Sequence, residues 1–320
     1  MGGSILGSRA IYDFLKNKIK KKIYFIDNLI STNDFSKKKK FLNLIVSKSG
    51  NTLETITNIN IHVKSKDTNI FITENKKSYL YSLAINLKSE IVHHNNYIGG
   101  RYSVLSEVGM LPAALMGLNP IKFRQLNNLI KNKRFFNSLL YNVEKILSLT
   151  KKKKINSIFL NYDPSLQNFL EWYKQLVGES LGKKGIGILP VISNMPKDNH
   201  SVMQLYLDGF KKNYYTFFSL RNDKSDKIKN LNLYNFNFLE NKTINQIVIN
   251  QKIATEKVFL NKNIPFRSFE VLKRDETTLG ELFIFFILET ILLGKALNVN
   301  PYDQPSVELI KTETKKRLIK

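Results

Sequence analysis

Short apolar runs alternate with helix-like segments along the first part of the chain. The runs predict four strands, at residues 23–26, 42–46, 69–73 and 91–92. Between the strands, apolar side chains recur near the helical period, for example from Leu53 through Ile56 to Ile59 and Ile61. Strands separated by helices are typical of a doubly wound parallel sheet, which binds its ligands at the carboxyl ends of the strands.

A second alternation follows a run of four lysines at residues 151–154, which we interpret as a linker. It predicts a helix and four strands, at residues 166–176 and at residues 155–160, 187–192, 214–220 and 269–272. We therefore expect an α/β protein with two doubly wound parallel-sheet domains and flanking helices. The expected domains are residues 1–125 and 126–300, followed by a C-terminal helical segment at residues 301–320.

The strand at residues 42–46 ends in a small polar loop, Ser47-Lys48-Ser49-Gly50-Asn51-Thr52, and a helix begins directly after it. This arrangement directs backbone N–H groups and a helix N-terminus at an anion. The hydroxyl groups of the loop would add hydrogen-bond donors, and its lysine would add a positive charge. The loop therefore predicts a phosphate site, although it lacks the Gly-Lys-Ser/Thr of a nucleotide P-loop. An ordinary capped strand-to-helix turn is the alternative.

Two other glycine pairs lie in the first domain. Gly2-Gly3-Ser4 opens directly into a helical pattern and is similar to the second half of a strand-loop-helix phosphate site, without the preceding strand. Gly99-Gly100-Arg101-Tyr102-Ser103 predicts a tight turn that brings a guanidinium group into a cleft. A surface arginine at the start of a helix is the alternative interpretation of Arg101.

Two side chains could transfer protons. Glu179 follows the predicted helix beside Gly178, at a bend where a carboxylate can act as a general base. A solvated loop glutamate is the alternative. His200 lies at a loop-to-helix boundary and could move a proton between oxygens near neutral pH. We interpret the other three histidines, His62, His93 and His94, as structural. No histidine in the sequence has the spacing of metal ligands.

A turn-rich break, Asn300-Pro301-Tyr302-Asp303-Gln304-Pro305, separates the second alternation from a final helix. The helix begins near Val307 and carries Glu308 and Lys311. Taken alone, Lys311 is one more surface lysine in a lysine-rich tail.

Composition narrows the class of protein. A hydrophobic content of 42% with 11% aromatic residues indicates a folded chain. The absence of cysteine excludes disulfides, thiolate catalysis and cysteine-ligated zinc. The opening residues lack the apolar centre of a secretory signal, and the apolar run at residues 282–293 is too short for a membrane span and contains Glu289. We expect a cytoplasmic protein with no membrane partner.

The formal net charge of +24 would ordinarily favour a nucleic-acid partner. The lysines are scattered, however, with clusters at residues 20–22, 37–40 and 151–154 that fall at expected helix ends or loops. Stacking aromatic residues are not interleaved with these clusters. We therefore expect no nucleic-acid partner, and a general positive field that attracts anionic substrates.

Together the motifs closely resemble those of the phosphoglucose isomerase family, two-domain enzymes with the sugar-isomerase (SIS) fold. They occur in the order of the family and span nearly the whole chain. The matching motifs are Gly3-Ser4, the loop from Ser47 to Thr55, Gly99-Gly100-Arg101-Tyr102-Ser103, Gln175 with Glu179, Asn199-His200-Ser201, and Asp303-Gln304-Pro305 through Lys311.

The resemblance implies reversible isomerisation of glucose 6-phosphate and fructose 6-phosphate through a cis-enediol, with no cofactor and no metal. Glu179 would carry the proton between C1 and C2, and Arg101 would stabilise the enediolate. His200 would assist ring opening, with Lys311 as its partner. The residues expected to bind the sugar phosphate are Gly3, Ser4, Ser47, Lys48, Ser49, Thr52, Gln175 and Gln304.

The resemblance further implies a homodimer in which the histidine comes from the neighbouring subunit. Two departures stand out: the N-terminal helices and first strand of the family are missing before Gly2, and Ser306 stands where the family usually has glycine. Two other functions stay open. One is a non-catalytic phosphosugar sensor, which needs only the phosphate loop, and the other is an isomerase that also accepts mannose 6-phosphate.

Overall fold

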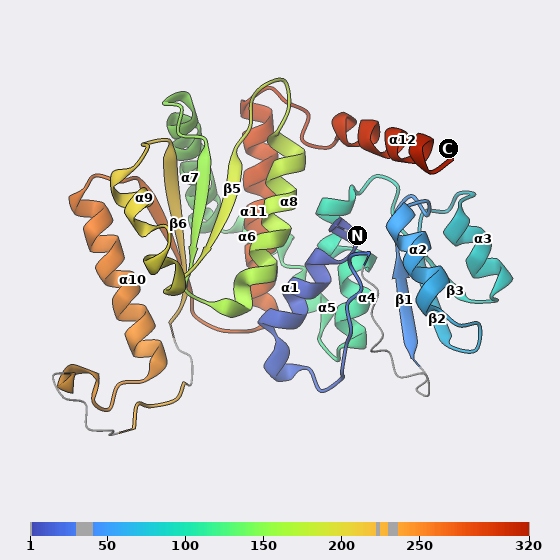
Figure 1. Cartoon of the computed structure of the whole chain (residues 1–320), viewed down its shortest axis with the longest axis horizontal. Helices are drawn as coiled ribbons and strands as arrows, with labels where there is room; N and C mark the ends of the chain where they lie inside the picture. The colour runs from blue at the N-terminus through green and yellow to red at the C-terminus, as the bar shows by residue number, and fades with distance from the viewer. Residues whose placement is uncertain (1, 30–40, 222–224, 230–235, 320) are drawn as a thin grey trace. The chain divides into compact units, whose positions relative to one another are not determined.

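The computed structural model describes residues 2–29, 41–221, 225–229 and 236–319. The chain has an α/β fold with two parallel sheets, one in each of two compact units (Figure 1). Unit 1 comprises Met1–Asn128 and Asp275–Ile284, and unit 2 comprises Leu129–Arg274 and Phe285–Lys320.

Unit 1 contains a three-stranded parallel sheet of order β1-β2-β3. Its strands are β1 (Leu42–Val46), β2 (Thr68–Thr73) and β3 (Glu90–His93), connected by α2 (Leu53–His62) and α3 (Tyr79–Asn86). The register pairs Ile45 with Phe71 and Phe71 with Ile91. A small apolar core holds these helices on the sheet and consists of Ile45, Ile59, Phe71, Leu80 and Ala84. The parallel order places the carboxyl ends of all three strands at one edge.

The remaining elements of unit 1 are helical. They are η1 (Gly2–Ser4), α1 (Leu6–Phe14), η2 (Lys16–Lys18), η3 (Gly100–Leu105), α4 (Glu107–Leu115), α5 (Pro120–Phe123) and α6 (Leu126–Lys131), the last of which spans the limit of the unit. Asp275–Ile284 falls within the range expected for the second domain, but it belongs to unit 1. Two contacts show why: the Lys18 Nζ lies 2.7 Å from the Glu276 Oε2, and Gly280 packs on the backbone of Phe123.

The strand predicted at residues 23–26 is wrong, because this segment has no strand structure. Its aromatic side chains pack individually on other side chains. The rings of Phe25 and Tyr12 lie 5.5 Å apart, and Tyr24 contacts Phe41 edge-on. Tyr24 is half exposed. Apolar character in so short a run therefore reflects local ring packing here, with no ladder of backbone hydrogen bonds.

Unit 2 contains a four-stranded parallel sheet of order β5-β4-β6-β7. The strands are β4 (Asn156–Asn161), β5 (Leu189–Asn194), β6 (Asn213–Leu220) and β7 (Phe266–Val271). The helices are α7 (Lys133–Lys151), η4 (Pro164–Leu166), α8 (Gln167–Leu181), η5 (Lys197–His200), α9 (Met203–Asp208), η6 (Asn237–Leu239), α10 (Ile244–Asn261), α11 (Glu276–Ala296, shared with unit 1) and α12 (Pro305–Ile319).

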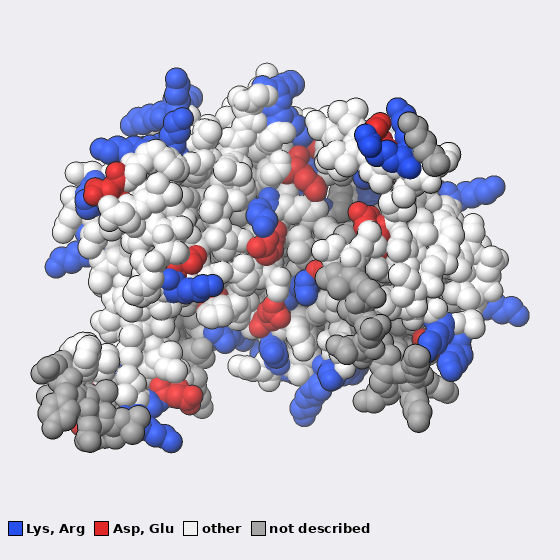
Figure 2. Space-filling model, viewed as in Figure 1, with Lys and Arg blue, Asp and Glu red and all other residues white. Residues whose placement is uncertain are grey.

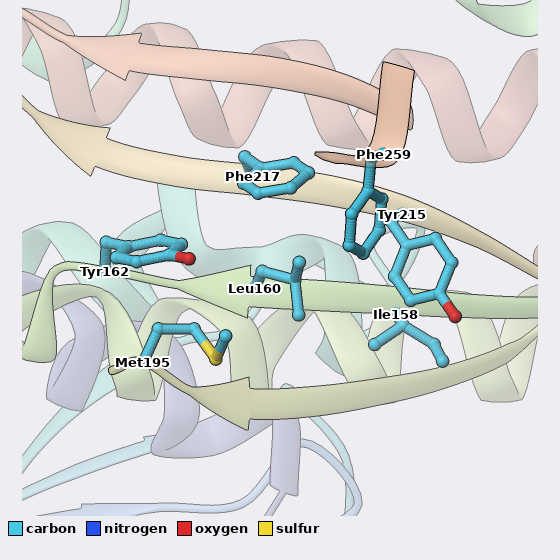
Figure 3. Packing of buried hydrophobic residues seen from close by; sticks show 7 residues of the cluster. All are labelled: Ile158, Leu160, Tyr162, Met195, Tyr215, Phe217 and Phe259. Atoms are coloured by element: carbon cyan, nitrogen blue, oxygen red, sulfur yellow. The ribbon is translucent and has the colours of Figure 1, made fainter. Parts of the chain in front are cut away.

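Both faces of this second sheet are covered, and its strand β6 is buried along its whole length. One face packs against α9 and α10 through the cluster drawn in Figure 3: Ile158, Leu160, Tyr162, Met195, Tyr215, Phe217 and Phe259. The opposite face packs against α8 and α11. There the ring of Phe159 lies 4.7 Å from that of Tyr173, and Phe286 lies 4.9 Å from Tyr173.

One helix in the described part of the chain, α11, is long and apolar enough to cross a membrane by length and composition alone. Its most apolar window is 56% buried. Within unit 2 its Phe286 packs on aromatic rings of the sheet, and its Glu289 is fully buried against Arg267. These contacts are those of a core helix.

Charged side chains are dispersed over the surface. Figure 2 shows Lys and Arg on both units with Asp and Glu among them. Residues 20–22 follow η2, and residues 151–154 include the end of α7 and the turn after it. The lysine cluster at residues 37–40 lies outside the described residues.

Candidate active site

The predicted phosphate loop lies at the carboxyl edge of the first sheet, between β1 and α2. The Ser47 N–H donates to the Ile72 carbonyl at 3.0 Å, so the loop leaves the sheet while still attached to β2. The hydroxyl oxygens of Ser47 and Thr52 are 2.9 Å apart. Thr52 is the N-cap of α2, where the first-turn N–H groups have no partner within the helix. Two hydroxyl groups and a helix N-terminus thus gather hydrogen-bond donors in one loop.

Gly50 allows the loop to turn this tightly. Its φ is +66°, and a Cβ added there would lie 2.1 Å from the Ser78 Oγ. The turn is also secured from α3, because the Leu80 N–H donates to the Gly50 carbonyl at 3.1 Å and the Tyr79 N–H donates to the Asn51 Oδ1 at 2.9 Å. Both the conformation and the space require glycine.

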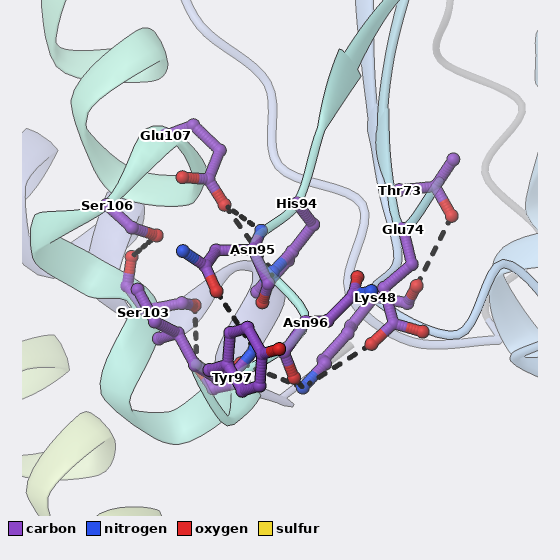
Figure 4. A network of polar contacts seen from close by, with 12 residues as sticks. Lys48, Thr73, Glu74, His94, Asn95, Asn96, Tyr97, Ser103, Ser106 and Glu107 are labelled. Carbon is purple, nitrogen blue, oxygen red and sulfur yellow. Dashed lines mark hydrogen bonds and ion pairs between the residues drawn. The ribbon is translucent and has the colours of Figure 1, made fainter. Parts of the chain in front are cut away.

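Lys48 lies in the loop as predicted, and its side chain extends along the sheet edge (Figure 4). The Nζ donates to the carbonyls of Asn96 and Ile98, at 2.9 Å each, and lies 3.5 Å from the Glu74 Oε1. Burial raises the pKa of Glu74, but its ion pairs with Lys76 and Lys48 lower the pKa by more, so that the pKa lies below its ordinary value. Glu74 is therefore a carboxylate at neutral pH.

Sequence reasoning missed Glu74 and Glu107. Glu74 follows β2 directly, so the rule that located Ser47 at the end of β1 would have found it. Glu107 is the first residue of α4, and its Oε1 accepts from the Asn95 N–H at 3.1 Å and lies 3.4 Å from the His94 Nδ1 (Figure 4). Glu107 thus binds the residues after β3 directly, and Glu74 contacts them through Lys48.

Gly3 and Arg101 are brought together in unit 1. A Cβ on Gly3 would lie 2.3 Å from the Gly100 carbonyl carbon, so η1 and η3 touch through their backbones. Arg101 is only 3% exposed, and its guanidinium carbon lies 5.2 Å from the centre of the Tyr102 ring. The Ser103 hydroxyl donates to the Gly100 carbonyl at 2.7 Å, which fixes the turn. Ser4 ends η1 and is half-buried.

Gln175 and Glu179 are brought together in unit 2. The Gln175 Nε2 donates to the Glu179 Oε1 at 2.8 Å, one helical turn apart on α8. Our prediction that Glu179 follows the helix at a bend is wrong, because α8 continues to Leu181. Gly178 does not end the helix, since buried Leu176, Val177 and Leu181 outweigh its weak helix propensity. The carboxylate is thus held on a rigid element.

The other predicted residues of unit 2 lie on separate elements. His200 ends η5 and is exposed, while Gln304 is half-buried just before α12. Lys311 is exposed on α12, where its Nζ donates to the Glu308 Oε1 at 2.6 Å. Within the described ranges, no group of three or more His, Asp or Glu side chains is arranged to hold a metal ion.

Known proteins share both the sequence and the fold. A profile of the phosphoglucose isomerase family matches residues 1–194. Glucose-6-phosphate isomerase of Methanocaldococcus jannaschii is 34% identical over 337 residues, covering 96% of this chain and 80% of the relative. The enzyme of the same name from Acholeplasma laidlawii is 32% identical, covering 97% and 80%.

Two solved structures match nearly the whole chain. A hypothetical protein from Thermus thermophilus superposes with a TM-score of 0.88 at 25% identity, covering 99% of this chain and 82% of the other. A glucose-6-phosphate isomerase from Chlamydia trachomatis gives a TM-score of 0.79 at 19% identity, covering 99% and 68%. The second likeness, at its low identity, establishes the fold alone, and both agree with the predicted two-sheet SIS architecture.

Proposed function

This chain belongs to the phosphoglucose isomerase family, whose activity is the interconversion of glucose 6-phosphate and fructose 6-phosphate, and we propose how its residues carry out that reaction. Exchange between aldose and ketose moves a proton between C1 and C2 and leaves a cis-enediolate as the intermediate. The reaction therefore needs a base at the carbons and a cation at the oxygen that gains charge. Because only protons move, no redox cofactor takes part.

Glu179 is the proposed base. Its position on α8 and the hydrogen bond from Gln175 support this role, because a base must be held rigidly to reach a carbon-bound proton. This hydrogen bond is the observation that carries the proposal. Arg101 is the proposed cation. Its side chain is buried, and a guanidinium group carries its positive charge even in a buried position.

The phosphate of the substrate is proposed to bind at the loop between β1 and α2. The hydroxyls of Ser47, Ser49 and Thr52 and the N-terminus of α2 supply the donors. Binding energy from this remote group orients the reacting carbons. Gly3, Ser4, Gln175 and Gln304 are proposed to hold the sugar.

Ring opening is assigned to His200 with Lys311, and the active form is proposed to be a homodimer. His200 is exposed on η5, which leaves it available to a neighbouring subunit. Mixing the inactive variants His200→Ala and Glu179→Gln should restore part of the activity if subunits share sites, whereas light scattering should give the mass of two chains. A monomeric, fully active chain would contradict this assignment.

Conversion of fructose 6-phosphate in D2O, followed by proton NMR, tests the function. Isomerisation through an enediol should produce glucose 6-phosphate with deuterium at C2, because the base exchanges its proton with solvent. Binding of the sugar phosphate without conversion would instead support the sensor. Formation of mannose 6-phosphate in the same spectrum would support the broader isomerase, which differs only in the shape of the pocket around C2.

A further inference from the structure

The ammonium of Lys48 is surrounded by acceptors of its own chain. Two backbone carbonyls accept from it at 2.9 Å, and the Glu74 carboxylate lies 3.5 Å away. A lysine ammonium has three N–H donors, so these three acceptors account for all of them. The charge of Lys48 is met by Glu74, whose side chain is only 8% exposed. Figure 4 shows the side chain reaching across to Asn96.

The two carbonyls belong to the loop at residues 94–99, between β3 and η3. On its other side this loop is attached to α4 and β2. The Asn95 N–H donates to the Glu107 Oε1 at 3.1 Å, and the His94 N–H donates to the Thr73 carbonyl at 2.8 Å. Lys48 supplies the attachment on the side of the phosphate loop. The 94–99 loop is thus held between two charged groups from different elements.

The loop leads directly to Arg101. The Ile98 carbonyl lies three residues before it, and the Tyr102 N–H donates to the Gly99 carbonyl at 2.9 Å. Only Gly99 and Gly100 separate the bonded carbonyl from the arginine, and the Ser103 hydroxyl donates to the Gly100 carbonyl at 2.7 Å, so both glycines are bonded to the first residues of η3. The backbone of Gly3 also packs on Gly100. Displacement of Ile98 would therefore move the start of η3.

The backbone of Lys48, itself part of the phosphate loop, is also bound to the end of β2. The Glu74 N–H donates to the Lys48 carbonyl at 3.1 Å, and the Thr73 hydroxyl donates to it at 3.3 Å. The same residue is therefore fixed at one end in the phosphate loop and at the other end in the 94–99 loop. Its neighbour Ser47 carries one of the proposed phosphate-binding hydroxyls.

We propose that Lys48 is a positioning residue that sets the distance between the phosphate loop and Arg101, and that its ammonium is not a direct phosphate ligand. The role rests on the proposed function. A phosphate held at Ser47 and Thr52 fixes the sugar, and Lys48 fixes where Arg101 meets the enediolate. Misplacement of a charged group by about 1 Å costs on the order of 100-fold in rate.

Kinetics of Lys48→Met test this role. We expect kcat for fructose 6-phosphate to fall about tenfold or more through displacement of Arg101, while the inhibition constant of inorganic phosphate changes by less than about twofold. A direct ligand would give the reverse pattern, with phosphate inhibition weakened about tenfold or more and kcat nearly unchanged. That reverse pattern would overturn the proposal.

Lys76→Met is the matched control. Lys76 contacts the same Glu74 carboxylate, but its side chain is 58% exposed and lies in a turn after β2. Its replacement should leave kcat unchanged. An equal loss of kcat in both variants would mean that the charge on Glu74, and not the attachment of the 94–99 loop, matters, and would contradict the role of Lys48.

A double-mutant cycle separates action through Arg101 from a general disturbance. In an Arg101→Lys background the additional effect of Lys48→Met on kcat should largely vanish, whereas independent effects would multiply and overturn the proposal. If Lys48→Met does not fold, Lys48→Met/Glu74→Gln, which leaves no unpaired carboxylate, takes its place in every comparison. A folded parent chain that binds inorganic phosphate but does not convert fructose 6-phosphate would overturn the proposed function and, with it, this role.

Discussion

At the residue scale, two glycines with opposite surroundings give a direct test of the phosphate loop. Gly50 has a φ of +66°, and a Cβ there would meet the Ser78 Oγ at 2.1 Å. Gly178 lies in α8, and beyond the adjacent residues and the backbone of the helix itself no heavy atom lies within 4 Å of the Cβ that alanine would add. The same substitution should therefore change stability in opposite directions.

Gly50→Ala should lower the free energy of unfolding by more than about 1–2 kcal/mol, because left-handed backbone strain and the steric clash add. It should also raise KM for fructose 6-phosphate through distortion of the loop. Gly178→Ala should raise the free energy of unfolding by about 0.5–1 kcal/mol, because alanine favours the helix. Urea unfolding measures both values, and equal effects of the two variants would contradict this description of the loop.

Single residues show what the sequence could predict about the site. Ser47, Thr52 and Gly50 follow a largely apolar strand and precede a helix, so their placement at the sheet edge followed from the local pattern. The partners of Lys48 could not be predicted, since Asn96 and Ile98 are about fifty residues away and meet it only through β1-β2-β3 pairing. The roles of Glu179 and His200 came from family resemblance and stay predictions.

At the element scale, an ion pair joins β7 to α11 inside unit 2. Arg267 Nη2 lies 3.1 Å from the Glu289 Oε1, and a second bond joins Nη1 to Oε2. Arg267 also donates to Thr216 and Asn142, at 3.0 Å each. Burial lowers the pKa of Arg267, but Glu289 raises it more, so the pKa lies above its ordinary value. Glu289 itself is fully buried.

Glu289→Gln should lower the free energy of unfolding by about 3–5 kcal/mol, because it leaves a buried arginine without its counter-ion. Arg267→Met/Glu289→Leu should recover most of this loss, since neither charge then remains in the core. Asp208→Asn breaks the exposed Lys262 pair and should change stability by less than about 1 kcal/mol. A loss from Glu289→Gln no larger than that of Asp208→Asn would contradict the importance of this contact.

A tyrosine at the end of β4 should make the second sheet sensitive to high pH. Burial raises the pKa of Tyr162 to about 12, while its hydrogen bond to Thr255, at 3.1 Å, lowers it and Glu256 raises it. The unfolded chain has a tyrosine pKa of about 10. Because the pKa is raised in the folded state, the contribution of Tyr162 is fully present below pH 10 and is lost as the pH rises from 10 towards 12.

Between pH 10 and 12 the titration of Tyr162 should reduce the free energy of unfolding by about 1.4 kcal/mol per pH unit. Tyr162→Phe should remove its own share of this decline, while at pH 8 it should cost only the hydrogen bond to Thr255, about 0.5–1.5 kcal/mol. Urea unfolding at several pH values measures the slopes. Parallel slopes for the parent chain and Tyr162→Phe would contradict the burial of this hydroxyl as the cause.

At the scale of the whole molecule, the periodicity predicted the fold class and nearly all strands. β1 was predicted to the residue, whereas β5 lies two residues later than predicted, and β7 begins three residues and ends one residue earlier than predicted. The start of β5 was missed because the turn at Gly187 and the strand that begins at the exposed Leu189 lie in one apolar run, so the pattern does not mark where the strand begins. The segment at residues 23–26 failed because apolar content does not reveal whether a neighbouring strand is present to pair with it.

The sequence pattern also could not predict that residues 275–284 belong to unit 1. The apolar run of α11 continues across the division between residues 284 and 285, and nothing in its pattern divides the helix between the units. The division follows from contacts such as Gly280 against Phe123, which join residues more than 150 positions apart. Long-range packing of this kind leaves no periodic signal.

The central claim is that this chain isomerises sugar phosphates with Glu179 as the base. A coupled assay of fructose 6-phosphate conversion should compare the parent chain with Glu179→Gln and with Glu171→Gln, a carboxylate two turns earlier on α8 that pairs with Lys174. Glu179→Gln should lose at least about 100-fold in kcat, because a general base contributes that much or more. Glu171→Gln should keep the parent rate. Retained activity in Glu179→Gln would contradict the account.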